Sequence, residues 1–143
     1  MKKLVVLVLT ILFLTGCKTT EKNEYSFAGE SEHWKATYDY EGKETWDKKK
    51  GKTTYLNEDS YEFVLTYKGP KKKLASMEKL AYFYQTSGSS GGGTKEFSEP
   101  PTKLKIIDNG SSKGGTKVNE DEVIHVTVNW DGTEEIIEMR GRK

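Results

Sequence analysis

The stretch EVIHVTVNWDGTEEIIEM, residues 122–139, decides the fold class because it has the pattern of a β-hairpin. In its first half, every second residue is β-branched or aromatic: Ile124, Val126, Val128 and Trp130. Successive side chains of a strand point to opposite faces, so these four share one face. Asp131-Gly132 follows, a pair that tolerates the positive φ angles of a tight two-residue turn. The stretch therefore predicts two antiparallel strands joined at residues 131–132.

The same period of two recurs earlier in the chain. In EHWKATYDYEG, residues 32–42, one face collects aromatic and small apolar residues: Trp34, Ala36, Tyr38 and Tyr40. Further strand candidates are KTTYL (52–56), SYEFVLTYKG (60–69), EKLAYFYQT (78–86) and TKLKIIDN (102–109). Their wealth of Tyr, Val, Ile, Thr and Trp is typical of β-strands. We predict a mainly β domain of about six to eight strands.

The turn signals between these strands favour an antiparallel β-sandwich of the immunoglobulin-like kind, with a small β-barrel as the alternative. The disulfide that joins the two sheets in antibody domains is excluded, because the chain has a single cysteine. Only the segment after Gly69-Pro70 has a helical spacing of apolar residues, and we expect at most one short helical turn near residues 74–78. The glycine-rich segment SGSSGGG, residues 87–93, is expected to be a loop.

The beginning of the chain has the organisation of a secretion signal. Lys2 and Lys3 precede an apolar run from residue 4 to residue 14, and small residues follow it. Such a run would rise only about 16 Å as a helix, whereas the hydrocarbon core of a bilayer is about 30 Å thick, so we expect no membrane span. The next residues complete LTGC (14–17), which resembles the lipobox of bacterial lipoproteins. In those proteins the cysteine thiol is modified with diacylglycerol and the chain is cut just before it.

The resemblance to the lipobox implies a signal peptide at residues 1–16 and a lipid on Cys17. Residues 17–24 would then be the lipidated cysteine and a flexible tether, since KTTEKNE (18–24) is polar and lacks aromatic residues. Residues 25–143 are expected to form a single β-sandwich domain. The processed chain is nearly neutral, because 23 basic side chains, two of which are lost with the signal, face 22 acidic ones. This balance argues against nucleic acid as the main partner.

A second resemblance lies just after the predicted tether. Five residues are similar to the F-x-G-E-S-x-x-W stretch of small uncharacterised lipoproteins of Gram-positive bacteria: Phe27, Gly29, Glu30, Ser31 and Trp34. The stretch VTVNWDGTEE, residues 126–135, is similar to the hairpin that ends those proteins. The resemblance implies a host with one membrane and a location on the extracytoplasmic face of the cell membrane, next to the wall. It implies no activity.

Two sets of residues are candidates for binding. The first is Glu30, His33 and Trp34, which would line one edge of a binding face. Their structural interpretation is a bend at Gly29 followed by a large buried ring at Trp34 whose N–H needs one partner. Exposure separates the two interpretations, because an indole that binds a partner has to be accessible.

The second set consists of two lysine clusters in predicted loops: Lys48, Lys49, Lys50 and Lys71, Lys72, Lys73. Loops at one end of a sandwich can converge, and the two clusters would then bind anionic head groups or an anionic envelope polymer together. Each lysine near an anionic surface contributes about 1 kcal/mol. The alternative is that these lysines keep the domain soluble and protect strand edges from aggregation.

Motifs that would name a reaction are missing from the sequence. The serines are expected to lack the strand-to-helix elbow that exposes a nucleophile, and His33 and His125 are expected to face solvent rather than to hold a metal. GSSGGGTK, residues 88–95, lacks the G-K-[ST] of a phosphate-binding loop, and prolines follow it. We therefore predict no catalytic residue, no metal and no cofactor.

The sequence thus favours a lipid-anchored extracytoplasmic binding module. Its partners would be the membrane, through the lipid on Cys17, and an anionic envelope polymer or another surface protein. Two alternatives stay open: a passive structural or immunity-type lipoprotein, and an envelope hydrolase that uses a pair of carboxylates. A deep pocket in which two carboxylates face each other would favour the hydrolase.

Overall fold

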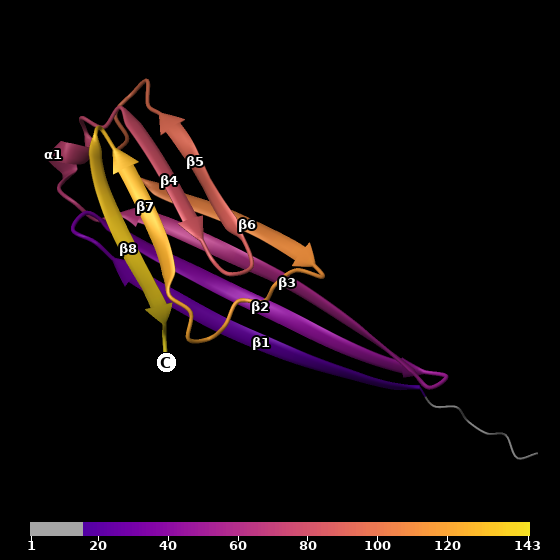
Figure 1. Ribbon diagram of the computed structural model, residues 1–143. Coiled ribbons are helices and arrows are strands. Elements are labelled where there is room, and N and C mark those ends of the chain that lie inside the picture. The colour runs from indigo at the N-terminus through magenta and orange to yellow at the C-terminus, as the bar shows by residue number, and fades with distance from the viewer. Residues whose placement is uncertain (1–15) are drawn as a thin grey trace, which may run out of the picture.

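The computed structural model describes residues 16–143, which form an antiparallel sheet of eight strands (Figure 1). The predicted signal peptide lies outside these residues, apart from Gly16. The strands are β1 (Cys17–Glu30), β2 (Trp34–Lys49), β3 (Lys52–Tyr67), β4 (Lys79–Gln85), β5 (Ser90–Glu96), β6 (Lys105–Lys113), β7 (Ile124–Trp130) and β8 (Thr133–Gly141). The one helix of the described residues is α1 (Lys71–Leu74), slightly earlier than the predicted turn. A mainly β fold with at most one short helix is confirmed.

The strand order is β5-β4-β7-β8-β1-β2-β3-β6. Two halves, β5-β4-β7-β8 and β1-β2-β3-β6, are joined by a short ladder in which Phe27 and Ala28 pair with Gly141 and Arg140. The sheet curls back on itself and is nearly closed, with β5 and β6 at its open edges (Figure 1). The two halves pack face to face as the layers of a sandwich do. Because the pairing of β1 with β8 joins the two halves into one continuous sheet, the fold is closer to the barrel alternative than to a sandwich of two separate sheets.

The core lies between the two halves and includes the inward-facing residues that the alternating pattern predicted. Ile124, Val126 and Val128 are fully buried, and so are Trp34 and Tyr38 on the opposite half. Aromatic rings bridge the halves: Tyr84 stacks on Phe63 with ring centroids 4.1 Å apart, and Trp34 meets Trp130 edge to face. Such side chains stabilise the fold by about 1.5–3 kcal/mol each when fully buried.

The predicted hairpin at residues 131–132 is confirmed. Trp130 pairs with Thr133, and the two residues between them have positive φ angles, 47° at Asp131 and 80° at Gly132. The Asp131 carboxylate also accepts hydrogen bonds from the backbone N–H groups of Glu78 and Lys79, so the same turn fixes the start of β4. Local turn chemistry therefore sets the register of one hairpin and the position of a neighbouring strand.

The prediction of a loop over residues 87–93 is wrong for its second half, because β5 begins at Ser90. Gly91 pairs with Tyr84 and Gly93 with Tyr82, and both tyrosine rings lie against the glycines. A Cβ on Gly91 would overlap the Tyr84 hydroxyl. The rings supply the cover that a glycine strand lacks, as aromatic residues do for glycines near sheet edges.

The prediction of a flexible tether over residues 17–24 is also wrong, because these residues belong to β1. They pair one by one with β2, from Cys17 opposite Lys48 to Glu24 opposite Glu41. Their polar side chains are mostly exposed, and the segment is ordered by the backbone ladder rather than by a core. KTTYL is likewise no separate strand, since β3 runs without a break from Lys52 to Tyr67.

Together these strands extend beyond the body of the molecule as a three-stranded arm (Figure 1). We define the arm as residues 17–24 of β1, 41–49 of β2 and 52–57 of β3. Its tip consists of residues 17–18 and 47–52. The turn between β2 and β3 is tight, with positive φ angles of 49° at Lys50 and 74° at Gly51.

Candidate functional site

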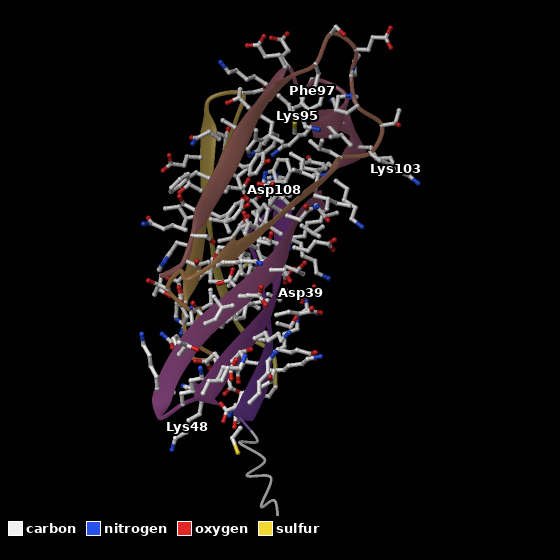
Figure 2. All side chains as sticks on the ribbon, turned by 90° about the vertical axis from the view of Figure 1, so that its right-hand side faces the viewer. Asp39, Lys48, Lys95, Phe97, Lys103 and Asp108 are labelled. Carbon is white, nitrogen blue, oxygen red and sulfur yellow. The ribbon has the colours of Figure 1, made fainter. Side chains whose placement is uncertain are left out.

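The tip of the arm brings the predicted lipidation site next to the first lysine cluster. Cys17 is exposed and lies directly opposite Lys48 in the β1–β2 ladder. Lys49 pairs with Lys52 across the turn. Figure 2 shows Lys48 at the narrow end of the molecule, far from Lys95 and Phe97 at the other end. A group attached to the Cys17 thiol would therefore leave the protein beside these lysines.

The two faces of the tip differ in chemistry. Residues directly opposite each other in a ladder share a face, so the Cys17 thiol lies on the same side as Lys48 and, two pairs further in, Trp46. Tyr55 of β3 packs against Trp46 on this face, with ring centroids 5.4 Å apart. The opposite face carries Asp47, whose carboxylate lies 3.2 Å from the Lys49 ammonium. We call the side with Cys17, Trp46 and Tyr55 the cysteine face.

The tip carries a net positive charge. It contains one acidic residue, Asp47, and five lysines: Lys18, Lys48, Lys49, Lys50 and Lys52. The ion pair between Lys49 and Asp47 is largely exposed, so it contributes little stability and is weakened by salt. The remaining ammonium groups at the tip are therefore available to anions in solution or at a surface.

The arm is attached to the body through a buried carboxylate at its root. Glu44 accepts hydrogen bonds from the Tyr55 hydroxyl at 2.6 Å and from the Asn23 amide at 3.3 Å, and its carboxylate lies 2.9 Å from the Lys117 ammonium. The hydrogen bond from Tyr55, with the contribution of Lys117, holds the pKa of Glu44 below its usual value. Lys117 belongs to the loop after β6, whose Gly114 N–H donates to the carbonyl of Asn57.

Sequence reasoning missed Glu44, although a signal was present. Glu44 falls in the buried register of β2, two residues after Gly42 and four after Tyr40. A carboxylate in an otherwise inward-facing series needs partners, because a buried charge without them is costly. Its partners come from β1, β3 and a distant loop, which no local pattern indicates.

Replacing Glu44 with glutamine should loosen the junction between arm and body. We expect a loss of about 1–3 kcal/mol in the free energy of unfolding, because the hydrogen bonds to a charged acceptor are weakened and Lys117 loses its counter-charge. Amide hydrogen exchange should accelerate in residues 53–57 and 114–118 more than in β7. Glu41→Gln, on the exposed face of the same strand, is the matched control and should change neither. Equal protection in both variants would contradict the role of Glu44.

The second lysine cluster does not join the first. Lys71, Lys72 and Lys73 lie in α1, beyond the far end of β3, and the two clusters are at opposite ends of the molecule (Figure 1). A strand of the length of β3 spans roughly 50 Å, which separates them. The expected convergence of the lysine loops is therefore wrong, because residues 52–67 form one continuous strand rather than two short ones.

The remaining binding candidates also lie at this far end, and two of them are buried. Trp34 is 0% exposed, so its indole is not accessible to a partner, and its Nε1 has no hydrogen-bond partner among the described residues. His33 is 7% exposed, which makes the expected solvent-facing position wrong, whereas His125 is exposed as expected. Glu30 forms an ion pair with Lys68 at 3.1 Å. The burial of Trp34 therefore supports the structural interpretation of this stretch, in which Trp34 is a core residue, over the binding interpretation.

His33 belongs to a network centred on Glu135 of β8. The Glu135 carboxylate accepts hydrogen bonds from Ser31 Oγ at 2.7 Å, from the His33 backbone N–H at 2.9 Å and from Trp130 Nε1 at 3.0 Å. His33 Nδ1 lies 3.0 Å from the same carboxylate, and its Nε2 lies 3.1 Å from the Lys73 ammonium. Burial alone would raise the pKa of Glu135, but these hydrogen bonds outweigh it and lower the pKa.

This network connects the two stretches that resemble Gram-positive lipoproteins, residues 27–34 and 126–135, to each other in the fold. Ser31 comes from F-x-G-E-S-x-x-W, and Trp130 and Glu135 come from the hairpin at residues 126–135. Gly29 is needed because a Cβ there would overlap the carbonyl oxygen of Glu138 in β8. The stretch therefore joins β1 and β2 to the hairpin of β7 and β8.

No protein-family model, curated protein or solved structure matches the chain. The resemblance to Gram-positive lipoproteins therefore stays a prediction. Among residues 16–143, no helix is long and apolar enough to span a bilayer.

Proposed function

We propose that the chain is a lipid-anchored binding module on the extracytoplasmic face of the cell membrane, held there by diacylglycerol on Cys17. The observation that carries the proposal is the ladder position of Cys17 opposite Lys48, at the tip of the arm. Two acyl chains give stable anchoring where one does not. Lysines that lie beside the anchor are brought to the anionic surface, where each contributes about 1 kcal/mol. The lipobox resemblance at residues 14–17 supports the same anchor.

In this arrangement the arm holds the body away from the bilayer. Eight paired residues of β1 span roughly 25 Å, so the body would stand at the interface between membrane and wall. The body offers unpaired strand edges to a partner: β5 and β6 are the outer strands of the sheet. An extended segment of a partner can pair with such an edge. An anionic envelope polymer or another surface protein is the proposed partner of the body.

The lowered pKa values of several carboxyl groups favour the binding module over the envelope hydrolase. Glu24, Glu41 and Glu58 line an open hollow of about 270 Å³, but lysines line it too. The hydrogen bond and charge of Lys113 lower the pKa of Glu58. A general acid needs the opposite shift, a raised pKa that keeps the proton near neutral pH. Glu44 and Glu135 are also shifted downward, so these carboxylates act as charged acceptors.

The anchor is tested by metabolic labelling with a fatty acid. The wild-type protein should carry the label, and Cys17→Ala should carry none. A double variant, Cys17→Ala with Thr19→Cys, places a thiol two residues further along the same face and is the matched control. It should stay unlabelled, because the lipobox specifies the position. Equal labelling of wild type and Cys17→Ala would overturn the anchor.

The binding role is tested on the protein in its membrane. Brief crosslinking, extraction in mild detergent and mass spectrometry should recover a specific protein or polymer together with the chain. A contact between the body and an anionic polymer should be lost when Lys71, Lys72 and Lys73 are changed to glutamine, and it should be kept when Lys48, Lys49 and Lys50 are changed. Recovery of lipid alone would favour the passive lipoprotein.

A further inference from the structure

We infer that the tip of the arm is itself a binding site for anionic phospholipid, with Trp46 and Tyr55 seated among the head groups. This inference rests on the proposed anchor at Cys17 and deepens it. The lipid chains would hold the protein at a membrane, whereas the tip would recognise the charge of that membrane and fix the orientation of the arm. The partner is therefore a bilayer surface that carries net negative charge.

The depth of the aromatic pair follows from the ladder. Trp46 lies opposite Thr19, two residues from Cys17, which is about 7 Å along the strand. The head-group region of one leaflet is about 5–7 Å thick. When the acyl chains on Cys17 enter the hydrocarbon core and the tip lysines hold the arm against the anionic surface, Trp46 comes to the level of the head groups. Tryptophan and tyrosine favour this level, because their rings have an apolar body and a polar edge.

Trp46 and Tyr55 are accessible on the cysteine face, the side from which the lipid on Cys17 would leave. Tyr55 is 50% exposed and Trp46 is half-buried against it, on the cysteine face from which the lipid would leave. The Tyr55 hydroxyl is bonded to Glu44 toward the root of the arm, which fixes the orientation of its ring. The pair is therefore held in place while the outer surfaces of both rings stay available.

The charges at the tip select an anionic surface. Lys48 lies on the cysteine face, and Lys49, Lys50 and Lys52 surround the turn at the end of the arm. The one acid of the tip, Asp47, lies on the opposite face and is paired with Lys49. The attraction is electrostatic and should fade over about 10 Å in 0.1 M salt. A zwitterionic bilayer offers no such attraction.

Trp46 also serves as the reporter for the test. The other tryptophans are buried in the body, Trp34 at 0% and Trp130 at 6% exposure. The protein extracted from membranes is reconstituted into vesicles of phosphatidylcholine alone or mixed with phosphatidylglycerol, each with lipid brominated near the top of the acyl chains. Brominated lipid should quench part of the fluorescence in the phosphatidylglycerol vesicles, and Trp46→Phe should abolish this quenching.

The charge requirement is tested in the same vesicles. Changing Lys48, Lys49 and Lys50 to glutamine, or raising the salt, should reduce the quenching several-fold. The matched control changes Lys71, Lys72 and Lys73 to glutamine at the far end and should keep the quenching. Far-ultraviolet circular dichroism of both triple variants should match the wild type. Equal quenching in neutral and anionic vesicles would overturn the recognition of charge.

Mass spectrometry of the same preparation separates this inference from the proposed anchor. If Cys17 carries its lipid but Trp46 is quenched by aqueous acrylamide and not by brominated lipid, the inference is overturned and the anchor stands. If Cys17 carries no lipid, the proposed anchor is overturned. Binding of that unmodified protein to phosphatidylglycerol vesicles would still support the tip as a lipid site, and lack of binding would overturn it.

Discussion

Replacing Glu135 with alanine should lower the free energy of unfolding by about 3–5 kcal/mol, the largest effect that we expect from a single polar residue. The side chain accepts hydrogen bonds from Ser31, His33 and Trp130, and its removal leaves these buried or half-buried donors without an acceptor. It also separates the β1–β2 corner from the β7–β8 hairpin. Unfolding in urea, followed by tryptophan fluorescence, measures the loss.

The neighbouring residue provides a control for this prediction. Glu134 is exposed, and Glu134→Ala should change stability by less than about 0.5 kcal/mol. If Glu135→Ala is no more destabilised than Glu134→Ala, the network does not support the fold.

The same carboxylate should make stability depend on pH in the acid range. Because the hydrogen bonds lower the pKa of Glu135 in the folded state below its ordinary value of 4.5, its stabilising contribution is fully present above that value. The contribution is lost as the pH falls through the lower folded-state pKa. Glu135→Gln, which is less stable at pH 7, should approach the wild type in stability as the pH falls below about 4. A constant difference between the two proteins across this range would contradict the assignment.

Replacing Gly29 with alanine should cost about 3 kcal/mol or more, at the upper end for overpacking. The new Cβ would overlap the carbonyl oxygen of Glu138 and come within 2.9 Å of Ile137 Cγ2. The obstacle is backbone, so β8 has to move away from β1 and open the ladder that joins the two halves. Denaturant unfolding gives the loss, and hydrogen exchange should show Gly141 among the amides that lose most protection.

Ala28→Ser tests whether this effect is specific to the contact with β8. Ala28 is the preceding residue of the same strand and points to the other face, so the change should cost less than about 0.5 kcal/mol. A Gly29→Ala variant as stable as Ala28→Ser would show that the two halves are not held as closely as the structure indicates.

Local patterns predicted several of the strands and one turn correctly, but not β5 or the first half of β1. The period of two at Trp34–Tyr40 and at Ile124–Trp130 follows from the pleat and needs no knowledge of the partner strand. The turn at Asp131-Gly132 was predictable for a similar reason, since it depends on two adjacent φ angles. These features are properties of short segments, and short segments are what a single sequence shows.

The site depended on contacts that no segment shows by itself. The bonds from Ser31 and His33 to Glu135 join residues 104 and 102 positions apart. The polar residues 18–24 have the composition of a tether, yet pairing with β2 makes them a strand and places Cys17 opposite Lys48. The uninterrupted length of β3 then puts the two lysine clusters at opposite ends. Strand pairing and strand length depend on residues far apart in the sequence. Composition alone therefore gave the wrong structure for residues 18–24 and the wrong positions for the lysine clusters.

Photo-crosslinking from the lipid side tests the proposed orientation most directly. Membranes that contain the lipidated protein are loaded with phosphatidylglycerol carrying a photoactivatable group in its head group, and the adducts are mapped by peptide mass spectrometry. The account predicts adducts on residues 17–18 and 46–55, at the tip of the arm, and none on residues 71–74. Adducts concentrated on Lys71, Lys72 and Lys73, or none at the tip of a protein that carries lipid on Cys17, would contradict it.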